Sequence, residues 1–142
     1  MRLVADANVL LSAAIGGRAK LILEHPDVEA VHAPAFALDE VHEYLGALAK
    51  KKRLAIDKLL LTLAALPITV VDRDEYRSHL PEATRRMRRR DPDDADVLAL
   101  ALHLKWPVWS NDNDFENIGV EWHTTAELLK TLGMTSATTR RP

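Results

Sequence analysis

Residues 91–115, DPDDADVLALALHLKWPVWSNDNDF, carry the clearest structural signal in the chain. The Ala- and Leu-rich segment 94–104 predicts a strongly apolar helix, and residues 107–109 predict a short strand. The SNDNDF loop then brings in Asp112 and Asp114. A helix that leads into a buried strand is the repeating unit of a parallel α/β sheet. The acidic residues of this block therefore stand where its predicted elements begin or end.

Short apolar runs alternate with longer helical patterns through the rest of the chain. The expected strands are residues 2–5, 28–33, 68–71, 107–109 and 119–122. The expected helices are residues 8–14, 18–24, 36–51, 57–66, 75–90 with an interruption at Pro81, 94–104 and 126–132. This alternation predicts an α/β domain with a mainly parallel central sheet covered by helices on both faces. In such sheets the functional crevice lies beyond the carboxyl ends of the strands.

Length and composition exclude several classes of protein. The chain has 142 residues, which fits one domain, here residues 1–132, followed by a tail at 133–142 that is expected to be disordered. The 19 Lys and Arg residues nearly balance the 21 Asp and Glu residues, so net charge does not indicate a nucleic-acid partner. The absence of cysteine excludes disulfides and thiolate metal sites. Without a ~20-residue apolar run or a secretory signal, we expect a cytoplasmic protein with no membrane segment.

Acidic residues recur in or beside apolar segments of this one small domain. They are Asp6, Glu40, Asp94, and Asp112 with Asp114. Each has an ordinary explanation when taken alone: a helix cap, a solvated helix face, compensation of a helix dipole, or a surface loop. Together they would repel one another and raise one another's pKa, unless a cation were bound between them. Oxygen ligands in this number suit Mg²⁺.

The motifs resemble those of the PIN-domain nucleases. MRLVADANVLLSA is similar to the family's opening strand and aspartate, and LDEVHEYL is similar to its glutamate-bearing helix. Residues 91–115 resemble its third and fourth motifs in one continuous block, which is the most specific part of the match. The resemblance covers roughly residues 1–132, with the motifs in the family's order.

The resemblance implies a three-layer α/β/α domain and a ribonuclease that depends on Mg²⁺ or Mn²⁺. Carried over by position, the four acids of the site are Asp6, Glu40, Asp94 and Asp112, with Asp114 in support. Many small members of the family are VapC-like toxins of type II toxin–antitoxin pairs. The expected partners are therefore RNA, a cognate antitoxin protein and a second copy of the chain.

Several assignments within the site stay open at this point. Glu43 lies one turn from Glu40 on the same helix face. Asp91, Asp93 and Asp96 compete with Asp94, which is preferred because Ala95 and the apolar helix follow it as in the family pattern. Either Asp112 or Asp114 could be the direct ligand. The Ser110 hydroxyl could bind a carboxylate or a substrate, or could simply end a strand.

Local charge and apolar runs suggest where the partners bind. Arg88, Arg89 and Arg90 directly precede the acidic block and are expected to bind RNA phosphates, although arginine runs are often only solvated helix ends. The leucine-rich runs 59–61 and 63–66 fit core burial first, and a homodimer or antitoxin surface second. The three tryptophans are expected in the core or an interface rather than at a base-stacking site.

Two other functions compete with the nuclease. One is a non-catalytic RNA- or protein-binding module on the same fold. All four motif positions carry an acid, which favours the enzyme over this module. The other is a phosphoacceptor receiver domain, which needs adjacent acids after the first strand and a lysine after a late strand. Asp6 follows Ala5, and the SNDNDF loop has no lysine, so the sequence disfavours the receiver.

Overall fold

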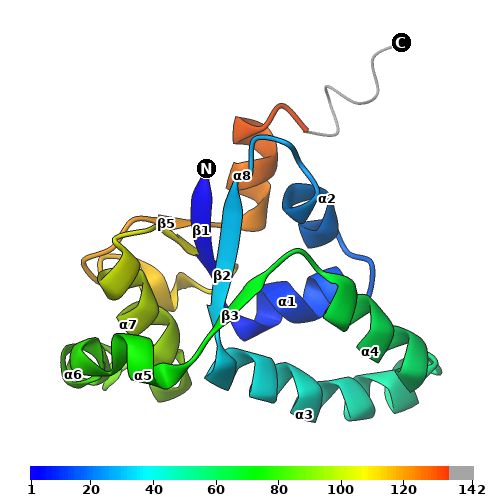
Figure 1. Ribbon diagram of the computed structural model, residues 1–142, viewed down its shortest axis with the longest axis horizontal. Helices are drawn as coiled ribbons and strands as arrows, with labels where there is room; N and C mark the ends of the chain where they lie inside the picture. The colour runs from blue at the N-terminus through cyan, green and yellow to red at the C-terminus, as the bar shows by residue number, and fades with distance from the viewer. Residues whose placement is uncertain (135–142) are drawn as a thin grey trace.

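The computed structural model describes residues 1–134, in which helices and strands alternate along the chain (Figure 1). The strands are β1 (Arg2–Ala5), β2 (Ala30–Pro34), β3 (Thr69–Val71), β4 (Val108–Trp109) and β5 (Trp122–His123). The α-helices are α1 (Ala7–Ala14), α2 (Ala19–Leu23), α3 (Ala35–Lys52), α4 (Ile56–Ala65), α5 (Arg73–Tyr76), α6 (Leu80–Met87), α7 (Ala95–Leu104) and α8 (Thr125–Thr131). Three short 3₁₀ segments are η1 (Arg77–His79), η2 (Pro92–Asp94) and η3 (Asn113–Phe115).

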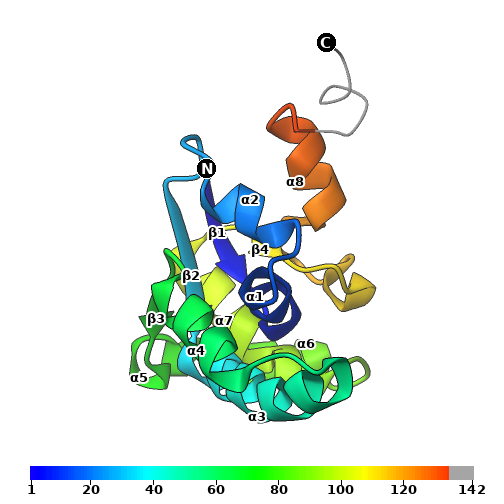
Figure 2. The ribbon, with the colours of Figure 1, turned by 90° about the vertical axis from the view of Figure 1, so that its right-hand side faces the viewer.

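The five strands form one sheet in the order β3-β2-β1-β4-β5, and every neighbouring pair is parallel. Helices α1, α2, α4 and α8 lie on one side of the sheet, and α5, α6 and α7 lie on the other (Figure 1). The turned view shows α1, α2 and α4 in front of the sheet and α7 behind it (Figure 2). This arrangement confirms the three-layer α/β architecture with a parallel central sheet.

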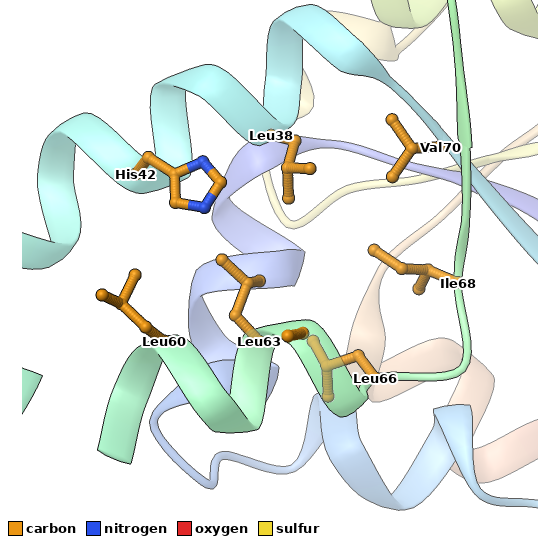
Figure 3. Close-up of a pocket in the computed structure, with 8 residues that line it drawn as sticks. Leu38, His42, Leu60, Leu63, Leu66, Ile68 and Val70 are labelled. Carbon is orange, nitrogen blue, oxygen red and sulfur yellow. The ribbon is translucent and has the colours of Figure 1, made fainter. Parts of the chain in front are cut away.

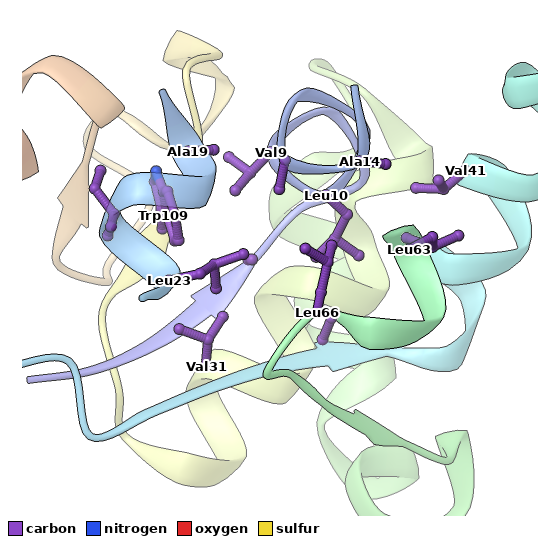
Figure 4. Packing of buried hydrophobic residues seen from close by; sticks show 14 of the residues in the cluster. Val9, Leu10, Ala14, Ala19, Leu23, Val31, Val41, Leu63, Leu66 and Trp109 are labelled. Atoms are coloured by element: carbon purple, nitrogen blue, oxygen red, sulfur yellow. The ribbon is translucent and has the colours of Figure 1, made fainter. Parts of the chain in front are cut away.

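Each face of the sheet has its own hydrophobic core. On the face of α1 and α2, Leu3 and Ala5 of β1 pack with the fully buried Trp109 of β4. Figure 4 shows Trp109, Val9 and Leu23 in this cluster. On the opposite face, Val4 packs with the residues of α6 and α7. Because β1 is buried on both faces, its sequence is a continuous apolar run, as is typical of a central parallel strand.

Pro81 lies in the first turn of α6 rather than inside a longer helix, so the expected interruption falls elsewhere. The helical segment breaks earlier, at the 3₁₀ turn Arg77–His79, and α6 begins at Leu80. A proline is tolerated in a first turn because the backbone N–H that it lacks would have no intrahelical partner there. Met87 then ends the helix, so the arginines that follow it lie outside regular structure.

The C-terminal helix begins with a capping box. The Thr124 hydroxyl accepts from the Glu127 N–H, while the Glu127 carboxylate accepts from the Thr124 N–H. Gly133 follows the helix with φ +71°, and Met134 packs against the first core. The remainder of the predicted tail, 135–142, lies outside the described residues. Within residues 1–134, no helix combines the length and apolarity that crossing a bilayer requires.

Candidate metal centre

The predicted acids come from the ends of central strands and from the N-terminal turns of helices. Asp6 follows β1, Glu40 is in the second turn of α3 after β2, and Asp112 follows β4. Asp94 ends η2 and is the N-cap of α7. Carboxylate oxygens of Asp91, Asp94 and Asp114 lie within 4.8 Å of one another. We call Asp6, Glu40, Asp91, Asp94, Asp112 and Asp114 the acidic cluster.

Asp6 has a structural role inside this cluster. One of its carboxylate oxygens accepts the Val9 N–H at 3.0 Å, which makes Asp6 the N-cap of α1. The other oxygen accepts the Ser110 hydroxyl. Burial raises the pKa of Asp6, the Ser110 hydrogen bond opposes the rise, and the nearby Asp112 charge adds to it. The helix-cap explanation for Asp6 is therefore correct, and it coexists with a place in the cluster.

Asp94 has no comparable partner. Its side chain makes no capping bond, and its Oδ2 is buried without a hydrogen-bond partner among the described residues. Burial, followed by the charges of Asp6, Asp91 and the two later aspartates, raises its pKa to about 8. A buried oxygen that lacks a donor costs free energy. A divalent cation is the partner that would satisfy this oxygen and offset the repulsion, so the donor set fits a metal of the Mg²⁺ type.

Glu40, rather than Glu43, lies close to the other acids. Glu40 is half-buried, and Glu43 is exposed on the same helix. Burial, then the charges of Asp93, Asp91 and Asp6, raises the pKa of Glu40 to about 7. A glutamate on a solvated helix face would be neither buried nor surrounded by other acids, so that explanation does not apply to Glu40.

The loop after β4 brings Asp112 and Asp114 into the cluster together. The Asp112 N–H donates to the Ser110 hydroxyl at 3.0 Å, and the Asp114 N–H donates to Asp112 Oδ1 at 3.0 Å. Burial and the neighbouring Asp112 raise the pKa of Asp114. Ser110 thus connects Asp6, 104 residues earlier in the chain, with this loop.

Asp91, which the sequence offers as an alternative to Asp94, lies beside it in the cluster. Asp91 is the N-cap of η2 and Asp94 is its last residue, so a single 3₁₀ turn separates the two. Asp96 lies elsewhere: its carboxylate accepts two hydrogen bonds from Arg73 at 2.9 Å and one from the Tyr76 hydroxyl at 2.6 Å. The Arg73 guanidinium also lies 5.4 Å from the Phe36 ring centroid. Asp96 is therefore a structural ion-pair residue.

The three arginines before the cluster have different environments. Arg88 and Arg89 are exposed beyond the end of α6. Arg90 donates to the backbone carbonyls of Asp114, at 2.7 Å, and of Glu116. Arg90 therefore holds the loop that carries Asp114, whereas the other two side chains face solvent.

An apolar cavity of about 290 Å³ lies between α3, α4 and β3, and Figure 3 shows its lining. It is lined by Leu38, His42, Leu60, Leu63, Ala64, Leu66, Ile68 and Val70. His42 is the titratable side chain among these, and no residue of the acidic cluster lines the cavity. Its chemistry suits burial of apolar groups rather than catalysis.

Fold and site together define a small α/β domain with an acidic centre at the carboxyl edge of a parallel sheet. A family model for the PIN domain matches residues 4–133, and the chain belongs to the PIN-domain family. Among curated proteins, no sequence matches the chain.

Solved structures share this fold at low sequence identity. VapBC2 from Rickettsia felis, bound to a DNA fragment from its promoter, matches with a TM-score of 0.68 and 13% identity over 87% of this chain and 98% of that chain. A toxin–antitoxin complex from Klebsiella pneumoniae matches with a TM-score of 0.64 and 19% identity over 88% of this chain and 98% of that one. DNA-bound VapBC from Salmonella typhimurium matches with a TM-score of 0.61 and 18% identity over 88% of this chain and 98% of that chain. These similarities show the fold.

Proposed function

We propose that this protein is a metal-dependent endoribonuclease and the VapC-like toxin of a type II toxin–antitoxin pair, acting in the cytoplasm. The observation that carries the proposal is the unpartnered, buried Asp94 oxygen within the acidic cluster. Membership of the PIN-domain family supports the nuclease activity. The toxin–antitoxin complexes among the structural neighbours support the biological role.

Asp6, Glu40, Asp94 and Asp112 are the residues that we assign to holding Mg²⁺ or Mn²⁺, with Asp114 and Asp91 beside them. When bound, a divalent cation supplies Lewis-acid chemistry: it stabilises negative charge on the phosphate and makes water a stronger nucleophile at neutral pH. No serine, histidine or cysteine nucleophile is needed for this reaction.

The remaining residues of the site are assigned to orienting the acidic cluster and to binding RNA. The Ser110 hydroxyl donates to Asp6, which fixes the direction of that carboxylate. Exposed Arg88 and Arg89 are placed to bind RNA phosphates, because the planar, permanently charged guanidinium suits phosphate. Arg90 acts indirectly, by holding the backbone of the Asp114 loop.

Cleavage of RNA with and without added Mg²⁺ or Mn²⁺ tests this function. The purified protein is expected to cleave single-stranded RNA with either ion and to stop when EDTA is added. RNA binding without cleavage at any tested concentration of either ion would instead support the non-catalytic binding module.

Replacing both Arg88 and Arg89 with alanine is expected to weaken RNA binding by the metal-free protein and to flatten its salt dependence. Loss of two phosphate contacts to a single strand lowers the slope of log affinity against log salt by about 1.4. The measurement is RNA affinity in EDTA at several salt concentrations. Arg2→Ala, which removes one positive charge at the amino end of β1, is the control for a general effect of charge. An unchanged slope in the double variant would make both arginines solvated surface residues.

Self-association is proposed to use the surface of α4. Leu59, Leu63 and Leu66 are buried as expected, but Leu60 is 39% and Leu61 is 71% exposed. Leu60 lines the apolar cavity of Figure 3, and Leu61 lines a second cavity that also includes Pro67. A second copy of the chain would remove this apolar surface from water.

The Leu61→Glu variant is therefore expected to be monomeric where the wild-type protein is dimeric. Its melting temperature should change little, because Leu61 is mostly exposed in the single chain. Light scattering at several concentrations measures the mass. Tyr44→Gln, at an exposed aromatic residue that lines a different cavity, is the control and should leave the dimer intact. A dimer that persists in Leu61→Glu would place the interface elsewhere.

A further inference from the structure

An open cleft of about 500 Å³ adjoins the acidic cluster at the carboxyl edge of the sheet. Its lining comes from the start of α1 after β1, from the loop after β4, and from β5 with the residue that follows it. The lining residues are Asn8, Asn111, Asp112, Asn113, Trp122 and Thr124. Asp112 belongs to both the cleft and the acidic cluster, so a molecule held at the cluster can extend into the cleft.

Trp122 forms a fixed aromatic wall of this cleft. Its indole N–H donates to the Ser110 carbonyl at 2.9 Å, and the residue also packs against the second core. The other tryptophans do not contribute to this cleft. Trp109 is fully buried, and Trp106 packs on the His32 ring, 4.5 Å between centroids, just before β4 begins. Trp122 is thus the tryptophan that stands beside the candidate metal centre.

The asparagines add polar groups around this wall. Asn111 Oδ1 accepts the Thr125 N–H at 2.8 Å, which orients the amide and leaves its NH₂ group as a donor. Asn8 and Asn113 are exposed and line the same cleft. Asparagine amides pair with the edges of nucleobases, and aromatic rings stack on their faces.

The charge of the cleft favours a base over a phosphate. Among the described residues that line it, the charged side chain is Asp112, and lysine and arginine do not contribute. A phosphate would be repelled there, whereas a neutral, planar, polar-edged ring would be accommodated. The exposed arginines that suit phosphates lie on the chain before Asp91 instead.

We propose that this cleft binds one nucleobase of single-stranded RNA, next to the phosphate that is cut, that Trp122 stacks on this base, and that Asn113 determines which base is preferred. The proposal rests on the ribonuclease function proposed above. Trp122 supplies stacking, which every base shares, and the asparagine amides supply discrimination between base edges.

Binding of short RNA homopolymers of A, C, G and U by the protein in EDTA tests the subsite without cleavage. The wild-type protein is expected to prefer one homopolymer. Trp122→Ala should weaken the preferred complex about 5- to 150-fold, which corresponds to the loss of one base–aromatic stack. Trp122→Phe should retain most of the affinity, and Asn113→Ala should reduce the differences between homopolymers. The salt slope should stay that of wild type, because no phosphate contact is removed.

Trp106→Ala is the matched control, since it removes a half-buried tryptophan away from the cleft. Melting temperatures of all variants separate a folding defect from loss of a subsite. Wild-type cleavage of RNA combined with unchanged affinity and base preference in Trp122→Ala and Asn113→Ala would overturn the subsite alone. A wild-type protein that neither binds nor cleaves RNA would overturn the ribonuclease function, and the subsite with it.

Discussion

The Asp94→Asn variant is expected to lose metal-dependent RNA cleavage by about a thousandfold or more, on the order of 4 kcal/mol of activation free energy. Asparagine keeps the shape of the side chain and removes the charge that would hold the cation. The fold should persist, because the Asp94 side chain makes no helix-capping bond that could be lost. The metal-free variant should melt at a higher temperature than wild type, since a buried carboxylate among like charges is removed.

Cleavage rates at saturating Mn²⁺ and melting curves in EDTA provide the two readouts. Asp39→Asn makes the same substitution on α3 at an exposed residue next to Glu40, and should leave both readouts at wild-type values. Full activity in Asp94→Asn would remove the main support for the metal centre. Asp6→Asn is a less clear test, because Asp6 also caps α1 and accepts from Ser110.

The metal-free protein is expected to lose thermal stability as pH rises from 5 to 8. Folding raises the pKa of Glu40 to about 7 and that of Asp94 to about 8, both above the values of unfolded chains. A raised carboxyl pKa means that the folded state holds the proton more tightly. Its contribution to stability is present at low pH and is lost as these groups ionise. Each unit of pKa difference corresponds to at most about 1.4 kcal/mol, and solvent screening lowers that figure for these partly exposed carboxyl groups, so a fall of about 5 °C is expected.

Saturating Mn²⁺ should reverse this trend, because a cation binds the ionised cluster and stabilises the folded state by mass action. Melting curves at pH 5, 6, 7 and 8, with EDTA or with Mn²⁺, measure both effects. Asp94→Asn should show a shallower pH dependence in EDTA and a smaller gain from Mn²⁺. A metal-free protein that becomes more stable between pH 5 and 8 would contradict the assigned pKa shifts.

Strand ends could be predicted from the sequence because they depend on short-range patterns. The apolar run before Asp6 and the helix–strand block of residues 91–115 each carry enough information to place an acid at the edge of a parallel sheet. Pro81 was harder to place, because a proline both breaks a helix and starts one. The choice between these effects depends on the 3₁₀ turn at Arg77–His79, which has no strong local signature.

The composition of the cluster could not be settled by spacing alone. Asp94 and Asp96 are two residues apart and have opposite roles, because Asp96 meets Arg73 and Tyr76 from a different segment. Nothing near Asp96 in the sequence specifies those long-range partners. Arg90 is a similar case: its bonds go to backbone carbonyls, and any residue type offers a carbonyl.

The hydrogen bond from Ser110 to Asp6 has a consequence for the order of synthesis. Asp6 is translated early, but the Ser110 hydroxyl that orients it, Asp112 and Asp114 are translated more than a hundred residues afterwards. Strand β1 also cannot pair with β4, its neighbour on one side, until β4 has been translated. A nascent or prematurely terminated chain that stops before β4 therefore lacks Asp112 and Asp114, two of the six acids of the cluster, and one neighbour of its central strand. The acidic cluster is therefore complete only after β4 and the loop that follows it have been made.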